Sequence, residues 1–254
     1  MLEQIKNRFK KSLGAEQKKK LHHFIARNKV IGFFNGLFFG GNLTKLAILY
    51  GTDKWGLHYY TPHYESHLKK FRHKKISLLE IGVGGYDNPH KGGNSLRMWK
   101  RYFPFGKIFS LDIYDKSPQE ERRIKIFRGS QVDTTFLDEV VESIGTIDVI
   151  IDDGSHINEH VIATFQHLFP KLKQNGIYII EDTQTSYLEH YGGSLDLENP
   201  NTLMNFFKKF PDNLNHKEFA SADYKPNYYD QNISEIHFYH NMIFLYKGKN
   251  QGNS

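Results

Sequence analysis

The chain contains no cysteine among its 254 residues. This absence excludes a disulfide framework, a thiolate zinc site and a cysteine nucleophile. A chain of this length can bury enough apolar surface to fold without disulfides or a structural metal. Because a reducing compartment is the simpler setting for such a chain, we expect a cytoplasmic protein.

Long apolar runs are also missing. No stretch approaches the roughly 20 apolar residues that a membrane-spanning helix needs. Apolar residues make up 39% of the chain and charged residues 24%, which is typical of a globular protein and not of a disordered one. The composition therefore predicts a folded globular protein with no transmembrane helix.

Positive charge is concentrated at the N-terminus. Residues 1–29 carry nine Lys or Arg and two Glu, which gives 9 − 2 = +7. The remainder carries 34 − 9 = 25 basic and 28 − 2 = 26 acidic residues, or −1. We therefore divide the chain into a basic N-terminal arm, residues 1–41, and a globular domain, residues 42–254. Since the domain itself is not basic, we expect no nucleic-acid partner.

The arm ends in an aromatic segment, Val30–Phe39, which is too short to span a bilayer and is interrupted by Gly and Asn. One interpretation is a helical arm that docks on its own domain or on a sister subunit, which predicts a homo-oligomer. The other is a basic, aromatic segment that lies on an anionic membrane surface. We favour the first interpretation and keep peripheral membrane contact as the alternative.

From Ile76 onward, short runs of apolar and β-branched residues alternate with helix-period segments. Such runs are typical of strands buried on both faces, and the alternation predicts an α/β fold with a doubly wound, mostly parallel, Rossmann-like sheet. The last stretch predicts an antiparallel strand pair around His240-Asn241. The expected strands are 76–81, 107–113, 124–127, 147–152, 177–181 and the pair within 236–247, and the expected helices are 95–102, 135–144 and 159–172.

Ligands of open α/β sheets bind beyond the carboxyl ends of the strands. The first predicted strand leads through Glu80 into Gly82, Gly84 and Gly85, whose spacing is not the full dinucleotide fingerprint. A carboxylate beside this loop disfavours pyrophosphate but tolerates a cationic ligand. The second strand ends at Asp112, an acid suited to ribose hydroxyls. S-adenosylmethionine therefore fits this edge better than a nicotinamide dinucleotide.

Acidic residues follow two later strands. Asp153 comes after the fourth, and Glu181 with Asp182 after the fifth. Carboxylates gathered at one sheet edge resist joint ionisation unless a cation lies between them, and oxygen ligands favour Mg²⁺. His156 stands three residues beyond Asp153, where a neutral imidazole can act as general base.

Asp152 and Ser155 lie in the same block, at a strand-to-helix turn. Short polar side chains at such turns are often helix N-caps. We interpret both as N-caps or as groups that support the ligands, and not as ligands themselves.

Several motifs occur together in a recognisable order. The motifs are Gly51-Thr52-Asp53-Lys54, His58–Pro62, Leu79–Gly85, Ser95–Trp99, Asp112, Gln131-Val132-Asp133, Asp152–His156 and Ile180–Tyr187. The series resembles the metal-dependent class I S-adenosylmethionine methyltransferases that O-methylate sugars of natural products, such as the mycinamicin and novobiocin sugar O-methyltransferases. The likeness covers about residues 46–248.

The resemblance implies a role for each matched position. Glu80 and the glycine loop, Gly82–Gly85, would hold the methionine moiety of the cofactor and Asp112 its ribose. Gln131 and Asp133 would lie near the adenine, and Thr52 and Lys54 near the cofactor. Asp153, Glu181 and Asp182 would bind Mg²⁺, with His156 as the base. The acceptor would be a hydroxyl of a sugar-bearing small molecule or glycan with a vicinal diol.

Three other interpretations remain open. A methyltransferase could act on a phenolic or lipid-linked acceptor, since any vicinal diol satisfies the metal. A nicotinamide-dependent oxidoreductase is disfavoured by Glu80 and by the second acidic block. A non-catalytic nucleoside-binding α/β protein would keep the fold alone. The arm and residues 188–232 match no pattern in the family, and we expect acceptor specificity to reside in the latter.

Overall fold

The computed structural model describes residues 41–219 and 223–250. The predicted arm, residues 1–41, lies outside this part except for its last residue, so both interpretations of it stay predictions. The chain divides into two compact units. The first comprises residues 1–75 and 92–105, and the second comprises residues 76–91 and 106–254.

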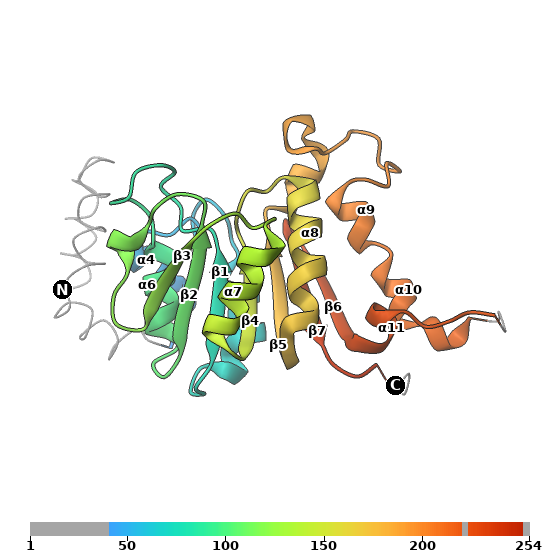
Figure 1. Ribbon diagram of the computed structural model, residues 1–254, viewed down its shortest axis with the longest axis horizontal. Coiled ribbons are helices and arrows are strands. Elements are labelled where there is room, and N and C mark those ends of the chain that lie inside the picture. The colour runs from blue at the N-terminus through green and yellow to red at the C-terminus, as the bar shows by residue number, and fades with distance from the viewer. Residues whose placement is uncertain (1–40, 220–222, 251–254) are drawn as a thin grey trace, which may run out of the picture. The chain divides into compact units, whose positions relative to one another are not determined.

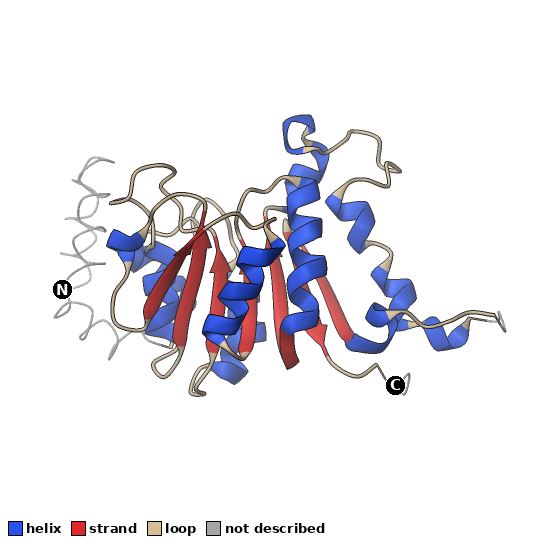
Figure 2. Cartoon of the chain, viewed as in Figure 1, coloured by secondary structure: helices blue, strands red, loops and turns tan. Residues whose placement is uncertain are grey.

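The second unit is built on a seven-stranded sheet with the order β3-β2-β1-β4-β5-β7-β6. Strands β1 to β5 pair in parallel, whereas β7 runs antiparallel to both β5 and β6. Figures 1 and 2 show the strands side by side. The predicted doubly wound sheet with an antiparallel C-terminal pair is confirmed. The strands are β1 Ser77–Ile81, β2 Lys107–Asp112, β3 Ile124–Arg128, β4 Ile147–Asp152, β5 Leu172–Glu181, β6 Ile233–Tyr239 and β7 Met242–Lys247.

Strand β5 begins five residues earlier than the sequence pattern predicted. Its first part, Leu172–Asn175, is mostly polar, and Asn175 has a φ of 65°. The register against β4 shifts between Ile147 and Val149. A polar, irregular strand start carries no apolar run, so the pattern located only the buried half. The turn between β6 and β7 lies at the predicted His240-Asn241, where Asn241 has a φ of 61°.

Five α-helices belong to this unit in the described residues. Helix α8 ends at Leu168, earlier than predicted, because Pro170 cannot donate a helical hydrogen bond and the chain continues as the 3₁₀ turn η3. The helices are α7 Thr134–Ile144, α8 Asn158–Leu168, α9 Leu203–Phe207, α10 Phe210–Leu214 and α11 Tyr228–Asn232. The 3₁₀ turns are η2 Ser117–Gln119, η3 Phe169–Lys171, η4 Thr183–Tyr187, η5 Glu189–Tyr191 and η6 His216–Glu218.

One face of the sheet packs against α7 to α10 to form a continuous core. Phe165 of α8 is fully buried and contacts Phe207 and Phe210. Burial of side chains of this size stabilises the fold by about 2 kcal/mol each. This rigid layer fixes the strand ends at which the polar residues gather.

The first unit packs three α-helices in the described residues: α4 Leu43–Tyr50, α5 Thr61–Leu68 and α6 Asn94–Tyr102, with the 3₁₀ turn η1 Lys69–Phe71. Glu65 links them, since its carboxylate accepts from the Leu43 N–H at 2.9 Å and from the Tyr102 hydroxyl at 3.2 Å. Burial is the main cause that raises the pKa of Tyr102 well above its ordinary value, which keeps this hydroxyl a donor.

Candidate functional site

The site lies where the direction of winding reverses. From β1 the sheet continues to β2 and β3 on one side and to β4 and β5 on the other. Ile81 pairs with Asp152, and Asp152 pairs with Ile180, so β1, β4 and β5 end at the same level. Residues that follow these three strands therefore gather at one edge, the position at which open α/β sheets bind ligands.

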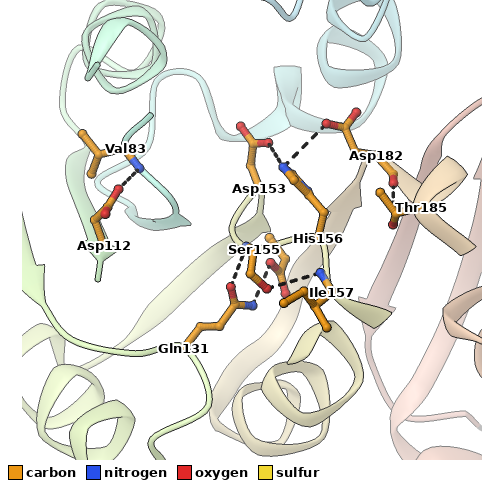
Figure 3. A network of polar contacts seen from close by, with 10 residues as sticks. Val83, Asp112, Gln131, Asp153, Ser155, His156, Ile157, Asp182 and Thr185 are labelled. Atoms are coloured by element: carbon orange, nitrogen blue, oxygen red, sulfur yellow. Dashed lines mark hydrogen bonds and ion pairs between the residues drawn. The ribbon is translucent and has the colours of Figure 1, made fainter. Parts of the chain in front are cut away.

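Four carboxylates and one imidazole converge at this edge. Ligand-capable atoms of Asp153, His156 and Asp182 all lie within 4.8 Å of one another, and so do those of Glu80, Asp153 and Glu181. Asp153 belongs to both groups. Figure 3 shows His156 between the Asp153 and Asp182 carboxylates. An oxygen-rich donor set of this kind suits a hard divalent cation.

His156 lies beside the carboxylates without a short hydrogen bond to either. Its Nε2 atom is 3.9 Å from Asp153 Oδ1 and 3.8 Å from Asp182 Oδ2 (Figure 3), beyond ordinary hydrogen-bonding distance. The side chain is about one quarter exposed. The imidazole can therefore receive a proton from a ligand while the two carboxylates stabilise the resulting positive charge.

Two of these residues adopt the left-handed backbone conformation that favours glycine. His156 has a φ of 57° and Asp182 a φ of 55°. The Asp182 carbonyl accepts from both the N–H and the hydroxyl of Thr185, each at 3.1 Å (Figure 3). Non-glycine residues in this region persist where their surroundings enforce it, and they cluster at functional sites.

Gly82 allows the glycine loop to contact the Asp153 segment. Its φ is +94°, and a Cβ atom there would lie 2.2 Å from the Asp153 carbonyl oxygen. A side chain at this position would therefore displace Asp153. Gly84 and Gly85 also have positive φ, and a Cβ on Gly84 would point into open space. That open side is where a ligand can approach the backbone closely.

Asp112 connects the second strand to the glycine loop. Its Oδ2 accepts from the Val83 N–H at 3.0 Å, as Figure 3 shows, and its Oδ1 accepts from the Tyr114 N–H at 2.9 Å. Each carboxylate oxygen can accept a second hydrogen bond. The carboxylate can thus hold the loop and also bind a diol, so its predicted role toward a ribose stays a prediction that this geometry permits.

Gln131 contacts the acidic block, and its predicted position near the adenine stays a prediction. Its Oε1 accepts from the Ser155 N–H at 2.8 Å (Figure 3). Its Nε2 donates to the Thr164 hydroxyl at 3.0 Å and lies 3.4 Å from Asp152 Oδ1. The amide is buried and engaged by protein groups at both ends. Gln131 therefore supports the loop that carries Asp153 and His156.

The N-cap interpretation of Asp152 and Ser155 is wrong, because α8 begins after Ile157 and has no side-chain cap. Ser155 instead accepts from the Ile157 N–H at 3.3 Å (Figure 3) and contacts His160 Nδ1 at 3.1 Å. Asp152 is buried beneath the site, and desolvation raises its pKa to about 7. Both residues support the loop that carries Asp153 and His156, in agreement with the supporting role that we gave as the other interpretation.

The remaining predicted residues have other local roles. Asp133 is exposed and caps α7 by accepting from the Phe136 N–H at 3.1 Å, so a contact with adenine stays a prediction. Thr52 and Lys54 are buried and belong to the first unit. Their predicted contact with the cofactor likewise stays a prediction.

Comparison with known proteins shows what this chain is similar to. No family model matches the chain. The mycinamicin VI 2''-O-methyltransferase of Micromonospora griseorubida is 45% identical over 212 residues, which cover 82% of this chain and 53% of that protein. A rhamnosyl tetracenomycin-C 2'-O-methyltransferase of Streptomyces olivaceus is 44% identical, covering 83% and 56%. The MycE methyltransferase of the mycinamycin pathway, in complex with Mg and SAH, superposes with a TM-score of 0.80 at 45% identity, covering 83% and 54%.

The chain is a homologue of these sugar O-methyltransferases. It spans about half the length of the curated relatives that it matches. The family resemblance and the class I methyltransferase fold predicted from the sequence are therefore confirmed.

Two features of this sugar O-methyltransferase homologue were missed by sequence reasoning. Glu80 was assigned to the cofactor alone, yet it lies with Asp153 and Glu181. Its position at the end of the strand beside β4 was a usable signal. Tyr191 has its ring centroid 6.5 Å from that of His156, and a separation of 35 residues gave no signal for this contact.

Proposed function

We propose that this chain is a Mg²⁺-dependent O-methyltransferase that moves a methyl group from S-adenosylmethionine to a hydroxyl of a sugar or glycan bearing a vicinal diol. One observation carries the proposal. The two groups of possible metal ligands, one with His156 and Asp182 and the other with Glu80 and Glu181, share Asp153, which lies beside Gly82 of the glycine loop. The names of the relatives support it. So does the crystallisation of the MycE methyltransferase with Mg, SAH and mycinamycin VI.

The residues present fit both Mg²⁺ and S-adenosylmethionine. Glu80 and Glu181 are buried carboxylates close to Asp153, an arrangement that like-charge repulsion disfavours unless a cation offsets it. Asp153, Glu181 and Asp182 would hold Mg²⁺, with Glu80 beside them. Glu80, the glycine loop and Asp112 would hold S-adenosylmethionine. When bound, Mg²⁺ would lower the pKa of an acceptor hydroxyl and S-adenosylmethionine would supply a methyl group already activated for transfer.

The protein contributes a base and alignment. His156 Nε2, facing Asp153 and Asp182, would take the proton from the acceptor hydroxyl as the oxygen attacks the methyl carbon and the carbon–sulfur bond breaks. The neighbouring carboxylates would stabilise the imidazolium. Because the methyl donor is activated already, much of the rate is expected from orientation of the two reactants. The enforced backbone of His156 and Asp182 serves that orientation.

The proposal predicts chelator-sensitive methyl transfer. We expect EDTA to remove activity by at least about 100-fold, because the acceptor hydroxyl then keeps a pKa near that of water, and excess Mg²⁺ to restore it. The measurement uses labelled S-adenosylmethionine and a panel of rhamnosides, glycans and catechol. Calorimetry should show SAH binding and no NAD binding. Activity that survives EDTA would contradict the metal site, and transfer to catechol alone would reassign the acceptor class.

We also infer that the protein is cytoplasmic and oligomeric and that its basic first unit contacts anionic membranes peripherally, as in the alternative interpretation of the arm. The first unit carries 19 − 4 = +15 and the second 15 − 24 = −9. Four exposed lysines of the first unit lie outside the arm and within seven residues of one another in the sequence: Lys69, Lys70, Lys74 and Lys75. Lysines near an anionic surface contribute about 1 kcal/mol each. No helix in residues 41–219 and 223–250 is long and apolar enough to cross a bilayer.

This inference predicts salt-sensitive binding to phosphatidylserine vesicles. We expect the protein to sediment with such vesicles at low ionic strength and to be released at about 0.5 M salt, because screening weakens surface electrostatics. Exchange of the four lysines for Gln should weaken binding and leave SAH affinity unchanged. Equal sedimentation with phosphatidylcholine vesicles would contradict an electrostatic contact.

A further inference from the structure

The segment that follows Asp182 folds back beside the candidate base. It runs through η4 and η5 and reaches α9 at Leu203, and Figure 1 shows it as the orange loop near the start of α8. Tyr191, the last residue of η5, presents its ring to His156 with centroids 6.5 Å apart and an interplanar angle of 75°. Tyr191 is half-buried. An aromatic side chain with an accessible surface thus borders the imidazole.

A single buried amide holds this segment in place. Asn158, which is 1% exposed, lies two residues after His156. Its Nδ2 donates to the Thr185 carbonyl at 3.0 Å and to the Tyr191 carbonyl at 2.9 Å. Its Oδ1 accepts from the Leu203 N–H at 2.6 Å. Asn158 therefore connects the loop that carries the base to the beginning, middle and end of the segment.

The segment is also closed upon itself. The Gly193 N–H donates to the Leu188 carbonyl at 3.0 Å, and the Ser194 N–H donates to the Ser186 carbonyl at 2.9 Å. A Cβ atom on Gly193 would lie 2.3 Å from the Thr185 carbonyl oxygen, so only glycine permits this packing. The position of Tyr191 is thereby fixed relative to His156 instead of varying with a loose loop.

The same segment exposes apolar side chains within its packed part and beyond it. Leu188 is 39% exposed, Leu197 58% and Leu195 78%. Apolar side chains gathered on one segment beside a site favour a ligand with an apolar portion. The segment thus offers an aromatic ring near the base and aliphatic side chains further along the chain.

We propose that Tyr191 is an acceptor-binding residue whose ring packs against the acceptor sugar beside His156, and that Asn158 is the residue that positions it. The inference rests on the proposed function. Binding pockets use aromatic faces with few, well-placed polar groups to fix orientation, and the C–H face of a sugar ring suits such packing. An apolar group attached to the sugar would then meet the leucines.

The test measures steady-state kinetics with octyl α-L-rhamnopyranoside, an amphiphilic vicinal diol. We expect Tyr191→Leu to raise its KM by about tenfold, equivalent to about 1.4 kcal/mol of binding, while the dissociation constant of SAH stays within about twofold of wild type. Tyr191→Phe should retain a near-native KM, because the ring and not the hydroxyl makes the contact. The matched control is Tyr228→Leu, at a 39% exposed tyrosine of α11, which should leave KM unchanged.

The positioning role has its own variant. Asn158→Asp keeps an oxygen that can accept from the Leu203 N–H but loses both donations, to Thr185 and Tyr191. We expect the same rise in KM together with faster amide hydrogen exchange confined to residues 185–203, and unchanged SAH affinity. A merely structural role would instead speed exchange across the sheet and weaken SAH binding.

The outcomes separate this inference from the proposed function. Wild-type turnover with an unchanged KM in Tyr191→Leu overturns the acceptor contact alone. Unchanged exchange in Asn158→Asp overturns the positioning role. If the wild type with S-adenosylmethionine and Mg²⁺ does not methylate the glycoside, and the wild type loaded with SAH and Mg²⁺ does not bind it by saturation-transfer NMR, both the acceptor class and the contact are overturned.

Discussion

Replacement of Asp153 by Asn is expected to abolish Mg²⁺ binding and to lower methyl transfer by about 10³-fold or more, since loss of about 4 kcal/mol of transition-state stabilisation corresponds to that factor. Asp153 is the residue shared by the two donor groups, with Glu80 and Glu181 on one side and His156 and Asp182 on the other. Asn has nearly the same shape, so the fold should survive. The measurements are calorimetric titration with Mg²⁺ and turnover at saturating cofactor.

The control for this variant is Asp138→Asn. Asp138 is an exposed carboxylate of α7 that pairs with Lys171 at 2.7 Å and with His167 at 2.9 Å. Its loss should change stability little, as for other exposed ion pairs, and leave Mg²⁺ binding intact. An Asp153→Asn enzyme that still responds to EDTA and Mg²⁺ as the wild type does would refute the shared-ligand geometry.

Replacement of His156 by Ala is expected to lower kcat by about 10² to 10⁴-fold, the range that general base catalysis typically contributes, with little change in SAH affinity. The reason is that Nε2 lies within 4 Å of two carboxylates but outside hydrogen-bonding distance of both. We therefore expect this nitrogen to accept a proton during the reaction and to contribute little to the stability of the fold. Single-turnover rates and calorimetry with SAH separate the two effects.

A second variant distinguishes lost chemistry from lost structure. His156→Gly suits the left-handed backbone, with its φ of 57°, so the loop should keep its conformation. We expect added imidazole to restore part of its activity. His167→Ala, on the exposed side of α8 beside Asp138, should leave kcat unaltered. Full activity of both His156 variants would remove this residue from the role of base.

The sequence alone was sufficient for the sheet type. Strands of a parallel sheet are covered on both faces, so they read as short apolar runs, and their alternation with helices indicates a doubly wound sheet. Parallel strands place their carboxyl ends at one edge of the sheet, which is why Asp153, Glu181 and Asp182 could be predicted as a group. Where the strand start is polar, as in Leu172–Asn175, the pattern carried no such information.

Only the tertiary structure decided the supporting contacts. Gln131 reaches Ser155 across 24 residues, and Asn158 reaches Leu203 across 45. Such pairings depend on how a helix packs on the sheet and on where a loop closes, and an isolated sequence encodes neither as a local pattern. The N-cap position of α8, at Ile157 and not at Asp152 or Ser155, had the same cause. Side-chain identity set which chemistry was available at this edge, while packing determined which atoms meet.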